Sequence, residues 1–160
     1  MSIEIERKFL VSSDDFKKEA YQKTYIKQGF LNSDKNRVVR VRLRDENGFL
    51  TVKGKSNQSG TSRFEWEKEI SKVDAKNLLE LCETGIIEKY RYLIKVENHI
   101  FEVDEFLGDN EDLIVAEVEL NSENEKFEKP NWLGKEVTGD VKYYNSNLSK
   151  KPYSYWKEKA

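Results

Sequence analysis

The sequence predicts a mainly β protein of the α+β type, whose strands close into an eight-stranded antiparallel barrel with a few helices packed outside. Two observations support this. Apolar and polar residues alternate with the two-residue period of a strand in eight segments of the 160-residue chain. Charged residues occupy one face of most of these segments, and their signs are segregated from segment to segment. A charged face that needs shielding favours a closed barrel over an open sheet.

The alternation places the eight strands at residues 3–11, 24–31, 37–45, 48–55, 62–70, 89–96, 99–106 and 113–121. Short connections of turn-forming residues indicate antiparallel hairpins. Asn47 and Gly48 tolerate positive φ and predict a type I′ turn after the third strand. Glu97 and Asn98 predict a similar turn after the sixth strand.

Helical signals are few and short. Ser12 and Ser13 precede an acidic first turn at residues 14–15 and predict a short helix there. Residues 73–83 place apolar side chains near one face of a second helix, which we expect Gly85 to end. The tail from residue 145 carries a weak signal for a short helix.

Composition limits the class of protein. The chain has 28 Lys or Arg and 30 Asp or Glu, yet its formal net charge is −2, which argues against a basic nucleic-acid arm or an acidic tail. Cys82 is the only cysteine, so no intramolecular disulfide can form. No apolar run approaches the ~18 residues of a membrane span, and the N-terminus lacks an apolar leader. We expect one cytoplasmic domain over residues 1–160, without a membrane partner.

Charged side chains on the strands form pairs of like sign two residues apart. Such pairs are unfavourable on a bare surface unless a group of opposite sign lies between them. Inside a barrel the charges must be paired, hydrated or bound to a ligand, because isolated buried charges cost several kcal/mol. Arginine forks bind phosphate oxygens, and carboxylates bind hard divalent cations. The pattern therefore favours a phosphate chain held together with metal ions.

The order of motifs along the chain resembles the triphosphate tunnel metalloenzymes, also called the CYTH superfamily. Glu4, Glu6 and Lys8 match the ExExK signature of that family. The later motifs follow in the family's order: VRVR (39–42), TVKG (51–54), FEWE (64–67), KYRYLI (89–94), FEVDEF (101–106), AEVEL (116–120) and VTGDVKYYN (137–145). The resemblance implies an eight-stranded tunnel and a metal-dependent triphosphatase, similar to the short bacterial members that act on inorganic triphosphate.

The resemblance also implies a role for each matching residue. The metal ligands would be Glu4, Glu6, Asp104, Glu117 and Glu119, and the ions Mg²⁺ or Mn²⁺, with two ions expected. The triphosphate ligands would be Lys8, Arg40, Arg42, Lys53, Lys89, Arg91 and Lys142. Lys8, Glu65 and Glu67 would take part in catalysis, in which metal-activated water attacks the terminal phosphorus. Related enzymes often carry a tyrosine that pairs with the lysine of the signature, and here Phe30 stands at the matching position.

The sequence alone leaves more than one substrate and more than one class of protein open. Short loops and the absence of an evident insertion favour inorganic triphosphate, hydrolysed to pyrophosphate and phosphate. The alternative enzymes are a nucleoside or thiamine triphosphatase and a class IV adenylate cyclase. A barrel that binds RNA or polyphosphate without turnover is the non-enzyme alternative, although the carboxylates make a nucleic-acid partner less favourable. The family also makes a homodimer conceivable.

Overall fold

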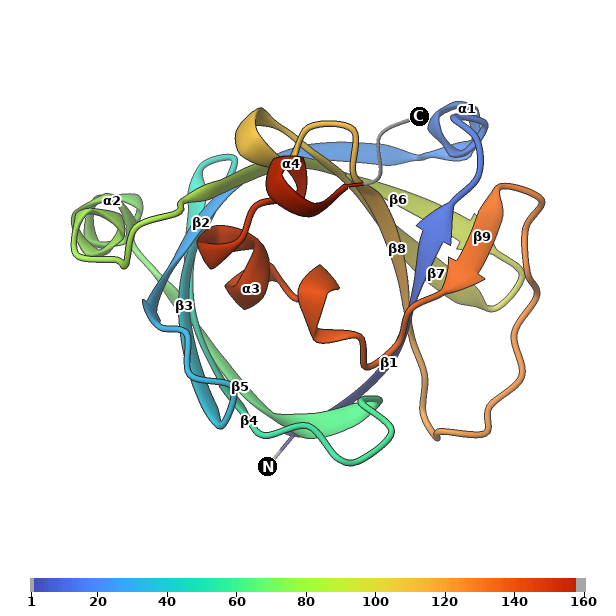
Figure 1. Ribbon diagram of the computed structural model, residues 1–160, viewed down its shortest axis with the longest axis horizontal. Helices are drawn as coiled ribbons and strands as arrows, with labels where there is room; N and C mark the ends of the chain where they lie inside the picture. Colours follow the sequence, from blue (N-terminus) through green and yellow to red (C-terminus); the bar gives the residue numbers. More distant parts are fainter. Residues whose placement is uncertain (1, 158–160) are drawn as a thin grey trace.

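Eight antiparallel strands form a closed barrel in the computed structural model, which describes residues 2–157 (Figure 1). The strands are β1 (Ser2–Val11), β2 (Gln22–Asn32), β3 (Arg37–Arg44), β4 (Asn47–Gly54), β5 (Ser62–Ile70), β6 (Ile87–Val96), β7 (His99–Phe106) and β8 (Ile114–Glu119). Their order around the barrel is β5-β4-β3-β2-β6-β7-β8-β1, and a β5–β1 pairing closes it. The predicted fold class is confirmed.

The first strand joins both ends of the sheet. The N-terminal half of β1 pairs with β5, with Glu4 opposite Arg63, and its C-terminal half pairs with β8, with Lys8 opposite Glu117. A ninth strand, β9 (Leu133–Glu136), adds to the edge of β1 outside the barrel. Sequence alternation did not predict β9, because four residues are too few to show a period.

The hairpin between β3 and β4 differs from the prediction. Arg44 pairs with Asn47, so the two-residue turn consists of Asp45 and Glu46 rather than Asn47 and Gly48. Asp45 supplies the positive φ, at 51°. The predicted turn at Glu97 and Asn98 is confirmed, since the residues on either side of it pair with each other.

The helices lie outside the barrel wall or across one of its mouths. Helix α1 (Phe16–Glu19) and helix α2 (Lys72–Glu80) pack on the outside, and Ser71 caps α2 by accepting a hydrogen bond from the Asp74 amide. The C-terminal segment, residues 141–156, consists of η2 (Val141–Tyr143), α3 (Asn145–Lys150) and α4 (Tyr153–Trp156). A further 3₁₀ turn, η1, spans Gly108–Asn110. No helix within residues 2–157 is long and apolar enough to cross a lipid bilayer.

Apolar side chains form two clusters on opposite sides of the barrel wall. The outer cluster joins Phe9, Phe101 and Trp132 beneath α1 and β9. The inner cluster lies inside the barrel at one end, where strand residues meet the C-terminal segment, and it comprises Phe30, Val38, Ile87, Phe106, Leu113, Val115, Val137, Tyr143 and Leu148. The C-terminal segment lies across this mouth of the barrel (Figure 1). The inner cluster packs beneath it, and the residues that line the rest of the interior are mostly charged.

Candidate active site

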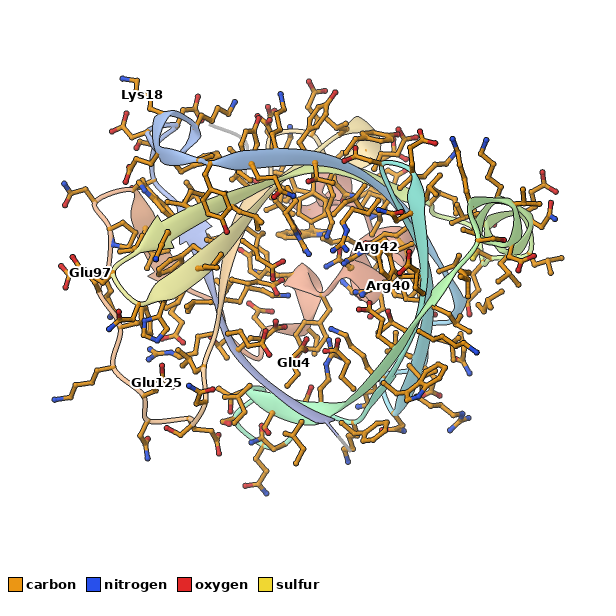
Figure 2. The ribbon with its side chains drawn as sticks, turned by 180° about the vertical axis from the view of Figure 1, so that it is seen from behind. Glu4, Lys18, Arg40, Arg42, Glu97 and Glu125 are labelled. Carbon is orange, nitrogen blue, oxygen red and sulfur yellow. The ribbon has the colours of Figure 1, made fainter. Side chains whose placement is uncertain are left out.

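The barrel interior contains a polar cavity of about 180 Å³, called the lumen below. Arg40, Arg42 and Glu4 point into it in Figure 2. Fourteen of its 19 lining residues are charged, and seven of these are acidic and seven basic. The acidic residues are Glu4, Glu6, Glu65, Glu67, Glu102, Glu117 and Glu119; the basic ones are Lys8, Arg40, Arg42, Arg44, Lys53, Arg63 and Arg91.

The strand order divides these charges by sign. Strands β5, β1, β8 and β7 are consecutive around the barrel and supply every acid that lines the lumen. The facing strands β4, β3, β2 and β6 supply only basic and neutral residues. We call these halves the acidic wall and the basic wall. Lys8 and Arg63 are the two bases of the acidic wall.

Ion pairs join the two walls where β4 meets β5. Lys53 Nζ lies 3.1 Å from Glu4 Oε1 and 3.9 Å from Glu65 Oε2. Arg40 Nη2 lies 3.8 Å from Glu67 Oε1. Lys53 is buried, so its attraction to Glu4 is weakly screened by solvent.

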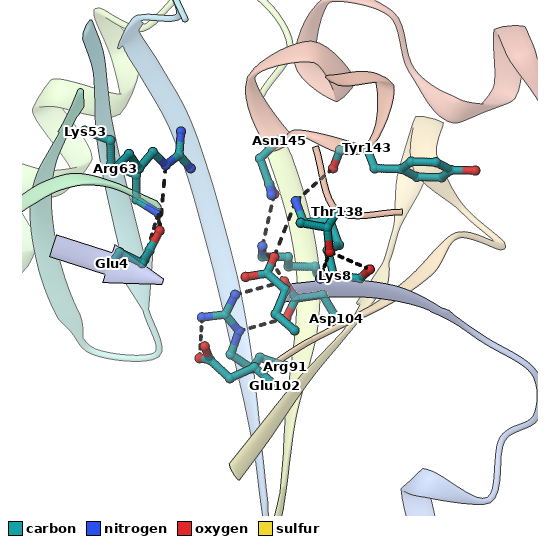
Figure 3. Close-up of polar contacts among 12 residues, drawn as sticks. Glu4, Lys8, Lys53, Arg63, Arg91, Glu102, Asp104, Thr138, Tyr143 and Asn145 are labelled. Carbon is teal, nitrogen blue, oxygen red and sulfur yellow. Dashed lines mark hydrogen bonds and ion pairs between the residues drawn. The ribbon is translucent and has the colours of Figure 1, made fainter. Parts of the chain in front are cut away.

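A second set of ion pairs joins the walls where β6 meets β7 (Figure 3). Arg91 donates from Nε and Nη2 to the two oxygens of Asp104 at 2.8 and 2.9 Å, and Lys89 Nζ lies 2.6 Å from Asp104 Oδ2. Burial would raise the pKa of Asp104, but Arg91 and Lys89 hold it below its ordinary value. Asp104 is therefore the counter-ion of two bases, whereas the sequence placed it among the metal ligands.

Lys89 also lies behind the lumen rather than on its surface. Its side chain is fully buried, and Nζ donates a hydrogen bond to Asn145 Oδ1 at 3.0 Å. Burial lowers the pKa of Lys89 to about 7 despite the attraction of Asp104. Lys89 thus connects the barrel wall to the C-terminal segment, and it is not among the residues that line the lumen.

Two arginines of the basic wall are incompletely paired. Arg42 is buried and donates from Nε to Gln28 Oε1 at 2.8 Å, but it forms no ion pair with any residue that the structure describes. Burial, together with Arg40 and Arg91, lowers the pKa of Arg42 well below its ordinary value. Arg40 Nε is buried without a hydrogen-bond partner in the described chain. A bound anion would supply the missing partner of these guanidinium groups. Arginine binds phosphate and carboxylate oxygens in bidentate fashion, so this wall suits such an anion.

Carboxyl groups of the acidic wall lie in pairs. Hydrogen bonding to Glu4 and burial raise the pKa of Glu65 to about 7. Burial would raise the pKa of Glu4, but Lys53 and Glu65 lower it to about 2. Burial and the neighbouring Glu117 raise the pKa of Glu6 well above its ordinary value. In each pair one carboxyl has a raised pKa and its neighbour, Glu4 or Glu117, a lowered one, because carboxyls held close together do not readily ionise at the same time.

These carboxyl pairs fit a divalent cation by their chemistry. Glu6 lies opposite Glu119 in the β1–β8 ladder, and Glu117 is the next inward residue of β8. Carboxylate oxygens are the ligands that Mg²⁺ and Mn²⁺ prefer, and a cation can replace a proton shared by two carboxyls. Within residues 2–157, no three acidic, histidine or cysteine side chains already converge as a metal-binding cluster. Binding would therefore require the carboxyls to rotate away from their present pairs.

Lys8 projects from the acidic wall toward the C-terminal segment. Its Nζ lies 3.6 Å from Glu117 Oε1 and 3.4 Å from the carbonyl oxygen of Tyr143. The ring centroid of Tyr144 is 5.1 Å from the same nitrogen. Phe30, which stands where related enzymes often carry a tyrosine, lines the lumen but has no hydroxyl. The tyrosine ring near Lys8 belongs to Tyr144 of the C-terminal segment.

The structure does not bring Lys142 to the lumen. Its side chain is 50% exposed, and Nζ lies 3.9 Å from Asp140 Oδ2. The 3₁₀ turn η2 directs Lys142 outward, over the ring of Trp156, while the adjacent Tyr143 is buried. The sequence motif could not reveal this, because neighbouring residues of a tight turn point in different directions.

Several lumen residues were not among the predicted site residues. Arg63 shares the inward face of β5 with Glu65 and Glu67, so alternation could have identified it; Glu102 alternates with Asp104 in the same way on β7. Tyr144 and Asn145 gave no signal, because the C-terminal segment has no strand period.

Comparison with known proteins identifies the family. The model of the CYTH domain family matches residues 2–155. The chain belongs to the CYTH domain family. An inorganic triphosphatase from Acetivibrio thermocellus is 52% identical over 159 residues, which cover 99% of this chain and 100% of that protein. An inorganic triphosphatase from Nitrosomonas europaea is 35% identical over 150 residues, or 91% of this CYTH chain and 96% of the relative.

A solved structure shows the same fold. The crystal structure of an inorganic triphosphatase superposes on this CYTH domain with a TM-score of 0.65 at 32% sequence identity. The superposition covers 93% of this chain and 95% of the other. The predicted family is therefore confirmed over nearly the whole sequence.

Proposed function

We propose that this CYTH domain hydrolyses inorganic triphosphate to pyrophosphate and phosphate with the help of a divalent cation, Mg²⁺ or Mn²⁺. The observation that carries the proposal is the pair of buried, incompletely paired arginines, Arg40 and Arg42, that face carboxylates across the lumen. Such a basic wall recognises phosphate oxygens, and the acidic wall opposite fits the cation that accompanies them. Both relatives described above are inorganic triphosphatases.

The lumen also supports the choice of substrate. Its lining is charged at 14 of 19 positions, and Phe30, Val38 and Tyr144 are its only residues with a large apolar surface. Its volume of about 180 Å³ lies below the 300–1,000 Å³ typical of sites for drug-sized organic ligands. These features favour a bare phosphate chain over a nucleoside or thiamine triphosphate.

Most charged groups of the lumen have a task in the proposed reaction. Arg40, Arg42 and Lys53 of the basic wall, with Arg63 and Lys8, bind the phosphate oxygens and hold the chain in line for attack. Glu4, Glu6, Glu117 and Glu119 hold the cation, which neutralises phosphate oxygens and lowers the pKa of water when it is bound. Glu65 and Glu67 are placed to orient the attacking water. The two-ion stoichiometry predicted from the sequence remains part of this proposal.

A substrate panel tests the proposal. Phosphate and pyrophosphate release are measured from triphosphate, ATP and thiamine triphosphate, each with Mg²⁺, Mn²⁺ or a chelator. We expect fastest release from triphosphate and none with the chelator. Glu4→Ala should abolish turnover, whereas Glu69→Ala, an exposed acid on the same barrel, should not. Formation of pyrophosphate and cyclic AMP from ATP would identify a cyclase, and RNA binding without any turnover would contradict an enzyme.

A further inference from the structure

A second, smaller cavity adjoins the lumen at its closed end. This side cavity has a volume of about 20 Å³, enough for about one water molecule. Five residues line both cavities: Glu4, Glu6, Lys8, Arg63 and Tyr144. The other lining residues come from the β4–β5 connection and from the stretch before the C-terminal segment: Ser56, Gly60, Thr61, Thr138 and Gly139.

Tyr144 stands at the boundary between the two cavities. Its ring centroid lies 5.1 Å from Lys8 Nζ and 5.8 Å from Arg63 Cζ, so the ring lies close to two bases that line both cavities. The backbone of Tyr144 is fixed at the start of α3, where its carbonyl accepts hydrogen bonds from the amides of Asn147 and Leu148 at 2.9 Å each. These hydrogen bonds fix the backbone from which the ring projects.

The far side of the side cavity is closed by two loops in contact. A Cβ atom added to Gly60 would lie 2.4 Å from Gly139 Cα, so the backbones touch there. Asn57 Oδ1 accepts hydrogen bonds from the amides of Thr61 and Ser62 at 3.1 and 3.2 Å and orders the first loop. With both loops fixed, the ring of Tyr144 controls how much of this space joins the lumen.

The chemistry of the side cavity matches a phosphoryl group. Lys8 and Arg63 supply positive charge, and Ser56 supplies a hydroxyl that can donate a hydrogen bond. The hydroxyls of Thr61 and Thr138 already bond the carboxylates of Glu123 and Glu136. Glu4 and Glu6 also line the cavity, and in the proposed function they hold the cation that accompanies the phosphate chain. The space is nevertheless too small for a phosphoryl group while the tyrosine ring stays in place. A phosphate chain bound in the lumen against Lys8 and Arg63 would therefore end at this ring.

We infer that Tyr144 is an end stop that fixes how far a phosphate chain enters the lumen and so selects which anhydride bond is cleaved. The inference rests on the proposed function and adds a specificity-determining residue to it. With the ring present, a linear tetraphosphate binds with its terminal phosphoryl group against Tyr144, and water cleaves it to triphosphate and phosphate. Without the ring, the chain can enter one phosphoryl group deeper, and water cleaves the central anhydride to two pyrophosphates.

The products from tetraphosphate test this inference. Initial products are resolved by ³¹P NMR or ion-exchange chromatography for the wild-type protein and for Tyr144→Ala. We expect phosphate and triphosphate from the wild type and mainly pyrophosphate from Tyr144→Ala. We also expect the ratio of kcat/KM for tetraphosphate over triphosphate to rise roughly tenfold, the size of a relieved steric conflict.

Matched variants distinguish the loss of the tyrosine ring from a general disturbance of the C-terminal segment as the cause of a changed product pattern. Tyr144→Phe keeps the ring and should keep the wild-type product pattern. Tyr155→Ala removes an 83% exposed tyrosine of the same segment and should also keep it. If Tyr144→Ala does not fold, Tyr144→Leu takes its place. It removes less of the side chain and should shift the products toward pyrophosphate to a smaller extent.

A failure of the end stop can be distinguished from a failure of the proposed function. Unchanged products and an unchanged kcat/KM ratio in folded Tyr144→Ala and Tyr144→Leu, with triphosphate hydrolysis intact in the wild type, would overturn the end stop alone. Absence of triphosphate hydrolysis in the wild type would overturn the proposed function, and the end stop with it.

Discussion

Arg91 donates two parallel hydrogen bonds to Asp104, from Nε to Oδ1 at 2.8 Å and from Nη2 to Oδ2 at 2.9 Å. Both side chains are buried, and Lys89 Nζ lies 2.6 Å from Asp104 Oδ2. The geometry makes Asp104 a structural anion that keeps two cations of the basic wall in place. Its contribution should therefore appear in stability as well as in activity.

Replacement of Asp104 by asparagine should destabilise the fold. Arg91 and Lys89 would lose their shared counter-ion, and an uncompensated buried charge costs about 3–5 kcal/mol. Urea unfolding measures the change in the free energy of unfolding, and Asp109→Asn, at an exposed position of η1, is the control. Unchanged stability combined with weaker metal binding would instead support Asp104 as a metal ligand.

Arg42→Met should reduce activity without reducing the stability of the fold. Loss of one preorganised donor to a phosphate should reduce kcat/KM for triphosphate about 100-fold or more. The free energy of unfolding should stay the same or rise by about 1–4 kcal/mol, because an apolar side chain replaces a buried charge without an acidic partner. Steady-state kinetics and urea unfolding measure both effects. Arg37→Met on the same strand, where the side chain is 69% exposed, should change neither, and a strong loss of stability in Arg42→Met would refute the argument.

Several features of this site followed from the alternation of residues along strands. The inward position of Glu4, Glu6 and Lys8 was predictable because a strand places every second residue on one face. The end stop at Tyr144 was not, since it depends on a contact between Lys8 and a segment more than 130 residues away. Lys142 lies in a tight turn, where a motif cannot report the direction of a side chain.

Lys89 should make stability depend on pH. Its pKa is lowered by burial to about 7 in the folded protein and is about 10.4 in an unfolded chain. Between these values the unfolded chain binds more protons, so the free energy of unfolding should rise as the pH increases from 7 to 9. Lys89→Met should remove this part of the slope in urea titrations at several pH values. The range stops at pH 9 because the pKa of Tyr25, raised to about 12 by burial and Glu88, acts in the opposite direction above pH 10. An identical slope in both proteins would contradict the lowered pKa.

Triphosphate binding should stabilise the protein. The anion would pair with Arg42 and with the unbonded Nε of Arg40, and a ligand at 100 times its Kd adds about 2.7 kcal/mol to the free energy of unfolding. Thermal unfolding is measured with triphosphate, with Mg²⁺ alone and with chelator present. Arg42→Met should show a smaller increase in Tm than the wild type. An equal increase from sulfate at the same ionic strength would indicate a general anion effect rather than a triphosphate site.

Gly85→Ala should loosen the C-terminal segment. Gly85 has a φ of +101°, and an added Cβ would lie 1.8 Å from the carbonyl oxygen of Ser149 in α3. Gly108→Ala is the matched control, since Gly108 also has a positive φ, of +64°, but open space around it. The control should lose about 1–2 kcal/mol through backbone strain alone, and Gly85→Ala should lose more and expose Trp156 to fluorescence quenchers. Equal losses and equal quenching would show that α3 does not depend on this contact.

The division of the lumen into an acidic and a basic wall has an electrical consequence. All seven acids that line the cavity lie on strands opposite five of its seven bases, and this segregation creates a field directed from the basic strands toward the acidic ones. Most of these charged side chains are buried or half-buried, so the field is weakly screened. An entering anion is therefore drawn sideways onto β3 and β4, while a cation is drawn toward β1 and β8. The barrel thus sorts the two components of a metal–phosphate complex before any single contact has formed.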